Sequence, residues 1–114
     1  MKRKTICNHR DFLTAPSDLT ARGDYFVLKV KNAKVIGDAR YGIVASKKTF
    51  KLAVQRNRAK RLLRDWIAFN ESLMLPDMDY IFIARPGILE ADRENGRAQI
   101  LQAFKKIVKL NNDK

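Results

Sequence analysis

The fold of this chain is decided by residues 41–70, which read YGIVASKKTFKLAVQRNRAKRLLRDWIAFN. The first six residues form a short, mostly apolar run that predicts a strand, and two lysines close it. No Gly or Pro occurs from Leu52 or Ala53 to about Asn70, and Thr49 is a residue type suited to cap a helix. The stretch therefore predicts a strand followed by a long helix.

The predicted helix has an apolar side and a cationic side. Its apolar residues recur at helical spacing and form one stripe, made of Ala59, Leu62, Leu63, Trp66 and Ile67. At about 100° per residue, the opposite side gathers Asn57, Lys60, Arg61 and Arg64. Arg56 falls at one border of the stripe and Arg58 nearer the other. We expect one side to face a core and the other to face a partner.

Two further strands are predicted on either side of this unit. Residues 25–31 are aromatic and β-branched and end in alternation, which favours a strand antiparallel to residues 41–46. Residues 80–84 form a nearly unbroken apolar run, typical of a strand covered on both faces, and end at Arg85-Pro86-Gly87.

Helices are predicted at both ends of the chain. Residues 9–15 fit a short helix that Pro16 ends. Residues 100–108 show helical spacing, with Lys105, Lys106 and Lys109 turned outward, and Asn95-Gly96 leaves the start of this helix open.

The order of elements predicts the fold class. A short helix, two or three strands, a helix, a strand and a helix give an α+β sandwich of αβββαβα type, with a single sheet and helices mainly on one face. Because the chain has 114 residues, we expect one domain over 1–114, with residues 1–7 flexible.

The charge predicts a polyanionic partner. The chain has 24 Lys and Arg against 12 Asp and Glu, a net charge of +12. The segment from 39 to 64 has no acid and nine basic residues, Arg40, Lys47, Lys48, Lys51, Arg56, Arg58, Lys60, Arg61 and Arg64. Arginine and lysine can neutralise phosphates, and Asn57 can bond a base edge, a sugar or a phosphate. A merely solvated basic helix remains the alternative.

Other classes of function find little support in the residues. No run approaches the roughly 20 apolar residues of a membrane span, and the apolar stripe is needed for the core instead of a membrane surface. Cys7 is the single cysteine, which agrees with a reducing cytoplasm, and the basic start lacks the apolar run of a signal peptide. One Cys and one His predict no zinc site or catalytic pair, and no glycine motif indicates a nucleotide cofactor.

The motifs resemble one known family. Residues 40–48, RYGIVASKK, followed by residues 53–65, AVQRNRAKRLLRD, resemble the signature of the bacterial ribonuclease P protein subunit. Residues 79–87, DYIFIARPG, look like the later strand of that family, and Arg10-Asp11-Phe12 like its first helix. The resemblance covers about residues 8–110.

The resemblance implies a fold and a function. It implies a left-handed crossover from the strand predicted over residues 41–46 to the strand predicted over residues 80–84. It also implies assembly with a large catalytic RNA. That RNA, with Mg²⁺ held mainly by the RNA, would remove the 5′ leader of precursor tRNA, so the chain would be an enzyme subunit without catalytic residues of its own. No DNA or membrane partner is implied, and the location would be the cytoplasm.

The resemblance also assigns residues to two surfaces. The catalytic RNA and the cleavage region would be contacted by Arg56, Asn57, Arg58, Lys60, Arg61 and Arg64. The positive charge adds Lys47, Lys48 and Lys51 to the predicted RNA-binding residues. The leader cleft would be lined by Phe12, Ser46 and Lys48, with Tyr25 or Phe26 stacking on a base or else packing in the core. The chain departs from the family at Pro16, Lys29 and the turn over 49–52, so leader binding should rely more on charge than on stacking.

Two alternatives remain beside this interpretation. One is a ribosomal-type or other RNA-binding protein without a role in cleavage, which the composition alone would favour. The other is a stand-alone nuclease that holds Mg²⁺ on Asp77, Asp79 and Glu90. Turn and helix-start acids explain these carboxylates more simply.

Overall fold

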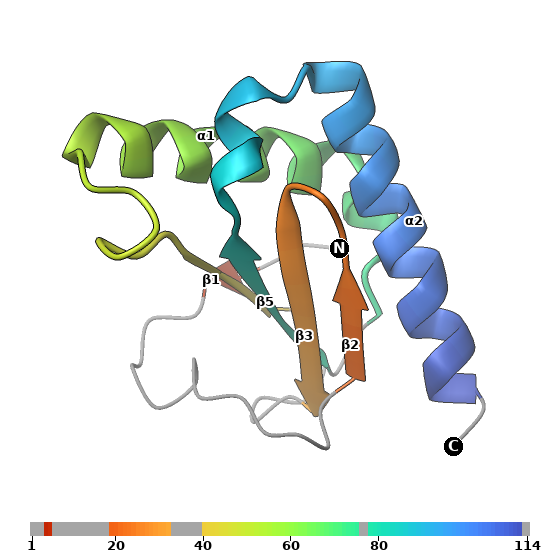
Figure 1. The fold of residues 1–114 in the computed structure, drawn as a ribbon. Coiled ribbons are helices and arrows are strands. Elements are labelled where there is room, and N and C mark those ends of the chain that lie inside the picture. The colour runs from red at the N-terminus through yellow and green to blue at the C-terminus, as the bar shows by residue number, and fades with distance from the viewer. Residues whose placement is uncertain (1–3, 6–18, 33–39, 76–77, 113–114) are drawn as a thin grey trace.

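The computed structural model describes residues 4–5, 19–32, 40–75 and 78–112 (Figure 1). Its strands are β1 (Lys4–Thr5), β2 (Leu19–Arg22), β3 (Phe26–Asn32), β4 (Arg40–Val44) and β5 (Met78–Ala84). Its α-helices are α1 (Ala53–Phe69) and α2 (Arg93–Asn112), and two short 3₁₀ helices are η2 (Glu71–Leu73) and η3 (Pro86–Glu90). The helix predicted over residues 9–15 lies outside the described residues.

The strands form one mixed sheet in the order β1-β4-β5-β3-β2. The central strand β5 is parallel to β4 and antiparallel to β3, and β2 completes a hairpin with β3. The chain therefore crosses over through α1 between two parallel strands, while the left-handed sense of this crossover stays a prediction. β4 runs antiparallel to β3 as predicted, but the two do not pair, because β5 lies between them.

Both helices bury their apolar sides against one face of the sheet. β3 and β5 turn alternate residues to this face in register, so that Phe26 pairs with Ala84 and Leu28 with Phe82. The ring of Phe104 in α2 lies 6.1 Å from that of Phe82 and 5.4 Å from that of Tyr80. In Figure 1, α2 runs beside the β2–β3 hairpin and α1 crosses the end of the sheet. The predicted α+β fold, with a single sheet and its helices mainly on one face, is confirmed.

Helix α1 has the predicted apolar stripe. Ala59, Leu63, Trp66 and Ile67 are fully buried, and Leu62 is partly buried against the same core. The predicted start was wrong in one respect. Leu52, not Thr49, is the capping residue, and the Gln55 side chain accepts a hydrogen bond from its N–H at 3.3 Å. Thr49 instead takes part in a turn with Ser46.

Helix α2 begins before Asn95-Gly96 because an aspartate caps it. The Asp92 carboxylate accepts a hydrogen bond from the Asn95 N–H at 2.7 Å, which satisfies a donor of the first turn. Gly96 lies inside the helix and against Trp66, where a Cβ would meet ring carbons at 2.1–2.5 Å. This glycine therefore allows the two helices to approach, and it does not break α2.

Two polar groups are buried within the sheet. Burial raises the pKa of the Tyr80 phenol, while a hydrogen bond received from the Leu75 N–H at 2.6 Å lowers it in part. The Asp79 carboxylate is fully buried and accepts two hydrogen bonds from Arg40, at 2.9 and 2.6 Å.

Among the described residues, neither α1 nor α2 combines the length and the apolar character that a membrane-spanning helix requires.

Candidate nucleic-acid interface

The outer side of α1 presents a row of cations to solvent. The residues of this cation row are Arg58, Lys60, Arg61 and Arg64, with Asn57 among them; all are exposed except Lys60, which is half-buried. Within the described ranges no carboxylate pairs with any of the four cations. The one acid of α1, Asp65, bonds Arg97 of α2 at 3.3 Å. The row keeps its positive charge and is free to bind an anion.

The loop that joins β4 to α1, residues 45–52, adds three more cations. Lys47, Lys48 and Lys51 are exposed in this lysine loop, and none of them is paired with an acid of the described residues. The loop precedes the first turn of α1, so its lysines extend the cation row beyond the start of the helix. The sequence-predicted RNA-binding residues therefore lie on one continuous stretch of backbone.

Arg56 is the exception among these predicted residues. It is half-buried, and its guanidinium donates hydrogen bonds to the carbonyls of Phe50 at 2.9 Å and of Lys51 at 3.3 Å. Its position at the border of the apolar stripe, as the helical spacing predicted, explains this direction. Arg56 thus contacts the lysine loop, whereas its neighbours Asn57 and Arg58 face solvent.

The residues predicted for a leader cleft are divided by the structure. Ser46 and Lys48 are exposed, as a binding role requires. The ring of Tyr25 packs at 5.8 Å from Trp66 and stays half-exposed. Phe26 is fully buried, 5.8 Å from Phe82, so the cleft position considered for it was wrong and the core alternative is correct. Phe12 lies outside the described residues.

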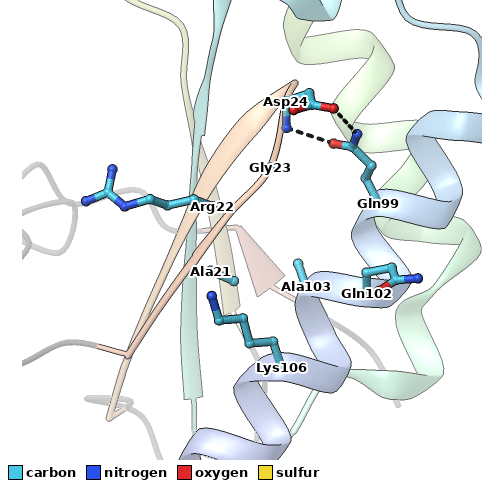
Figure 2. A pocket seen from close by; sticks show the side chains of 8 residues that line it. All are labelled: Ala21, Arg22, Gly23, Asp24, Gln99, Gln102, Ala103 and Lys106. Carbon is cyan, nitrogen blue, oxygen red and sulfur yellow. Dashed lines mark hydrogen bonds between the residues drawn. The ribbon is translucent and has the colours of Figure 1, made fainter.

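The face of the sheet turned away from the helices carries cations that the predicted site did not include. In β3, Lys29 lies opposite Thr20 and Lys31 lies opposite Asp79. Arg22 of β2 belongs to the same face, and its side chain points away from α2 (Figure 2). The alternation of Lys29 and Lys31 with buried residues was the available signal in the sequence. This face of the sheet therefore carries cations outside the predicted site, beside the buried Asp79 and Ile81.

Of the carboxylates considered for a nuclease, the structure describes Asp79 and Glu90, and these two do not belong to a cluster of metal-ligating side chains among the described residues. The Asp79 carboxylate is buried, and each of its two oxygens already accepts a hydrogen bond from Arg40, one from Nε and one from Nη2. Glu90 is exposed in η3, and Asp77 lies outside the described residues. Where the structure is described, no three metal-ligating side chains come together.

A hollow of about 350 Å³ separates the β2–β3 turn from α2 (Figure 2). Its base includes Ala21 and Ala103, and the Lys106 side chain extends toward it. Gln99 bridges the hollow at one end, since its amide accepts from the Asp24 N–H at 3.1 Å and donates to the Asp24 carboxylate at 3.2 Å. None of the predicted site residues lines this hollow.

Comparison with known proteins identifies one group of relatives. Residues 1–108 match the family model described as Ribonuclease P. The chain is 34% identical over 110 residues to the ribonuclease P protein component of Marinobacter nauticus, across 90% of this chain and 80% of that protein. It is 40% identical over 70 residues to that of Pseudomonas entomophila, across 61% of this chain and only about half, 52%, of that protein.

Solved structures show the same fold. The RNase P protein of Staphylococcus aureus matches with a TM-score of 0.73 and 28% identity, over 91% of this chain and 94% of that chain. The RNase P protein from Thermotoga maritima matches with a TM-score of 0.66 and 23% identity, over 79% of this chain and 84% of that one, and it supports the fold alone.

Proposed function

This chain belongs to the ribonuclease P protein family, and on that premise we propose that it is the protein subunit of a ribonucleoprotein that removes the 5′ leader of precursor tRNA. In this proposal the chain binds a catalytic RNA and the leader, and the RNA performs the phosphodiester hydrolysis. The observation that carries the proposal is the cation row with the lysine loop, which together present seven cations without acidic partners among the described residues.

The cation row and the lysine loop would neutralise phosphates of the catalytic RNA near the cleavage region. Phosphates that approach unpaired arginines and lysines displace condensed counterions, which favours association without any base contact. Asn57 is exposed one turn before Arg61 on the same side of α1, where its amide can bond a sugar or a base edge. Binding along this surface would bring the protein and the RNA into a fixed register.

The leader would be held mainly by charge. Ser46 and Lys48 are exposed at the end of β4, and Lys29 and Lys31 add positive charge to the face of the sheet turned away from the helices. Tyr25 is engaged with Trp66 and Phe26 is buried, so the described residues supply little aromatic surface for stacking. This supports the expectation that leader binding in this chain relies more on charge than on aromatic contacts.

We propose that the Mg²⁺ implied by the family is held mainly by the RNA. The described residues of this chain fit such an ion poorly, because no three metal-ligating side chains come together among them and the buried Asp79 is already bonded twice by Arg40. The contribution of the protein would be to offset phosphate repulsion, which otherwise requires a higher Mg²⁺ concentration to screen.

A reconstitution experiment tests the proposed function. Protein freed of RNA is mixed with precursor tRNA and Mg²⁺, with and without the matching catalytic RNA. We expect no cleavage by the protein alone, and cleavage at the 5′ end of the mature tRNA at lower Mg²⁺ than the RNA alone requires. Glu90→Gln, which removes an exposed carboxylate, should leave this activity intact.

Two results would overturn the proposal. Cleavage by RNA-free protein that Glu90→Gln abolishes would establish a stand-alone nuclease. RNA binding without any effect on the cleavage reaction or its Mg²⁺ requirement would establish an RNA-binding protein with no role in cleavage.

A further inference from the structure

We infer that Arg56 is a positioning residue that clamps the lysine loop, so that Lys47, Lys48 and Lys51 are presented to RNA phosphates in one arrangement. This inference rests on the proposed function. It separates Arg56 from Asn57 and Arg58, its neighbours in the Arg-Asn-Arg motif, because Arg56 would act on RNA through the loop and they would contact RNA themselves.

The contacts of Arg56 show the direction in which it acts. A single guanidinium nitrogen, Nη1, donates to two successive carbonyls, those of Phe50 and Lys51. Successive carbonyls of a loop that precedes a helix have no ladder partner, and the bond to the Phe50 carbonyl is partly buried, where an unpaired carbonyl would cost free energy, whereas the bond to the Lys51 carbonyl is exposed. A guanidinium has several donors in a fixed plane, so it can satisfy both carbonyls at once.

The clamp completes a set of anchors spaced along the lysine loop. At the start, the Ser46 hydroxyl accepts the Thr49 N–H at 3.2 Å and the Ser46 carbonyl accepts the Phe50 N–H at 2.9 Å. In the middle, the side chain of Phe50 is buried in the core. At the end, Gln55 accepts the Leu52 N–H. Lys47 and Lys48 stand within the first turn, and the carbonyl of Lys51 itself is one that Arg56 holds.

Fixing the loop matters because ordering a flexible chain opposes binding. A loop that is already ordered loses less conformational freedom when its lysines contact phosphates. Release of the clamp should therefore weaken RNA binding through the lysines, although none of the lysines has changed. An arginine that contacted a phosphate directly would act independently of them.

A double-mutant cycle separates these two roles. Affinity for the matching catalytic RNA is measured for Arg56→Ala in the natural chain and in a chain that carries Lys47→Ala, Lys48→Ala and Lys51→Ala. We expect Arg56→Ala to weaken binding on the order of tenfold in the natural chain. In the chain that lacks the three loop lysines, the same substitution should weaken binding less than about twofold. Arg58→Ala is the matched control and should cost the same factor in both chains.

Two further measurements give readouts that removal of a phosphate contact would not produce. In free Arg56→Ala protein, amide hydrogen exchange should accelerate at Phe50, whose N–H bonds Ser46, and stay unchanged at Leu63 in the middle of α1. Arg56→Lys retains the charge but not the planar guanidinium, so it should restore little of the RNA affinity.

Several outcomes would overturn the inference. Equal losses of affinity from Arg56→Ala in both chains, or full recovery by Arg56→Lys, would show a direct phosphate contact. Faster exchange along the whole of α1 would show a role in folding the helix. If Arg58→Ala weakens binding while the lysine substitutions do not, the lysine loop does not contact RNA, and only the inference about Arg56 fails. If neither Arg58→Ala nor the lysine substitutions weaken binding, the proposed RNA interface fails as well.

Discussion

Arginines have different surroundings at the two ends of α1. Toward its N-terminus and through its middle, Arg58, Arg61 and Arg64 face solvent without acidic partners in the described structure. At its C-terminal end, the arginines that approach it from α2 are drawn to Asp65, at 3.3 Å for Arg97 and 3.7 Å for Arg93. Whether a carboxylate lies within reach decides whether an arginine is available to a partner or is engaged within the fold.

The packing differs between the two ends in the same sense. Leu52 and Val54 near the start of α1 are 58% and 69% exposed, whereas Trp66 near its end is fully buried. The guanidinium carbon of Arg97 lies 4.1 Å from the centroid of the Phe69 ring, although Phe69 itself stays 62% exposed. The N-terminal part of α1 therefore leaves its cations and two apolar side chains open to solvent, whereas the C-terminal part contacts α2 through Trp66 and Arg97.

The largest effect expected from this contrast is a steep salt dependence of RNA binding. If the unpaired cations neutralise about 6–10 phosphates, affinity should fall by roughly 10³–10⁵ between about 50 and 200 mM salt. Filter binding or calorimetry with the matching catalytic RNA over a salt series would measure the slope. A flat response would mean that the exposed cations of α1 do not form the interface.

Removal of the buried indole should damage the fold and spare the RNA surface. Trp66→Ala should lower the free energy of unfolding by about 3–5 kcal/mol, because it leaves a large cavity between α1 and α2. Urea unfolding measures this loss, and RNA affinity of the folded fraction should change little. Trp66→Phe is the milder control, since Trp66 Nε1 has no hydrogen-bond partner among the described residues. Equal damage to binding and stability would show that the two ends of α1 are coupled.

Removal of three of the four cations of the cation row should have the converse effect. With Lys60, Arg61 and Arg64 all replaced by Ala, the slope of log affinity against log salt should decrease by about 3, roughly one unit for each phosphate that is no longer neutralised. Thermal unfolding should stay nearly unchanged, because these side chains lie away from the core stripe. A marked drop in melting temperature would show that the cations support the helix as well as the interface.

The helices and the basic side of α1 could be predicted from the sequence because periodicity is a local property. The stripe of apolar residues placed Trp66 in the core, and the same spacing placed Arg56 at its border. Strand β5 was identified because a strand at the centre of a sheet is apolar on both faces.

Other features depended on contacts between distant residues and could not be predicted. Strand β5 enters between β3 and β4, so the pairing of β4 was not visible from the order of the chain. Gly96 is recognisable as a packing residue only when Trp66 is seen beside it, 30 positions earlier in the chain. The choice between core and cleft for Phe26 also required the register of β3 with β5.

A side chain added at Gly96 should produce a smaller loss of stability than truncation of Trp66. In Gly96→Ala the Cβ would meet the indole at 2.1–2.5 Å, so one helix must shift, at about 1–3 kcal/mol. The intrinsic helix propensity of alanine would oppose this by up to about 1 kcal/mol. Urea unfolding should show a net loss in the natural chain and a smaller one in a chain with Trp66→Phe. A stabilised Gly96→Ala protein would mean that the helices have room to separate.

The smallest effect concerns the ion pairs at the C-terminal end of α1. Asp65→Asn removes the partner of Arg93 and Arg97, but the Asp65 side chain is 41% exposed, so solvent screens the attraction and the loss of stability should stay below about 1 kcal/mol. The freed arginines add positive charge next to the cation row, so RNA affinity should rise slightly at low salt and not at high salt. Glu90→Gln makes the same change in charge at an exposed position in η3 that forms no ion pair with these arginines among the described residues, and should not raise the affinity as much. If both variants bind RNA equally, the acid at position 65 does not limit where the interface ends, and the boundary between the two halves of α1 is set by packing alone.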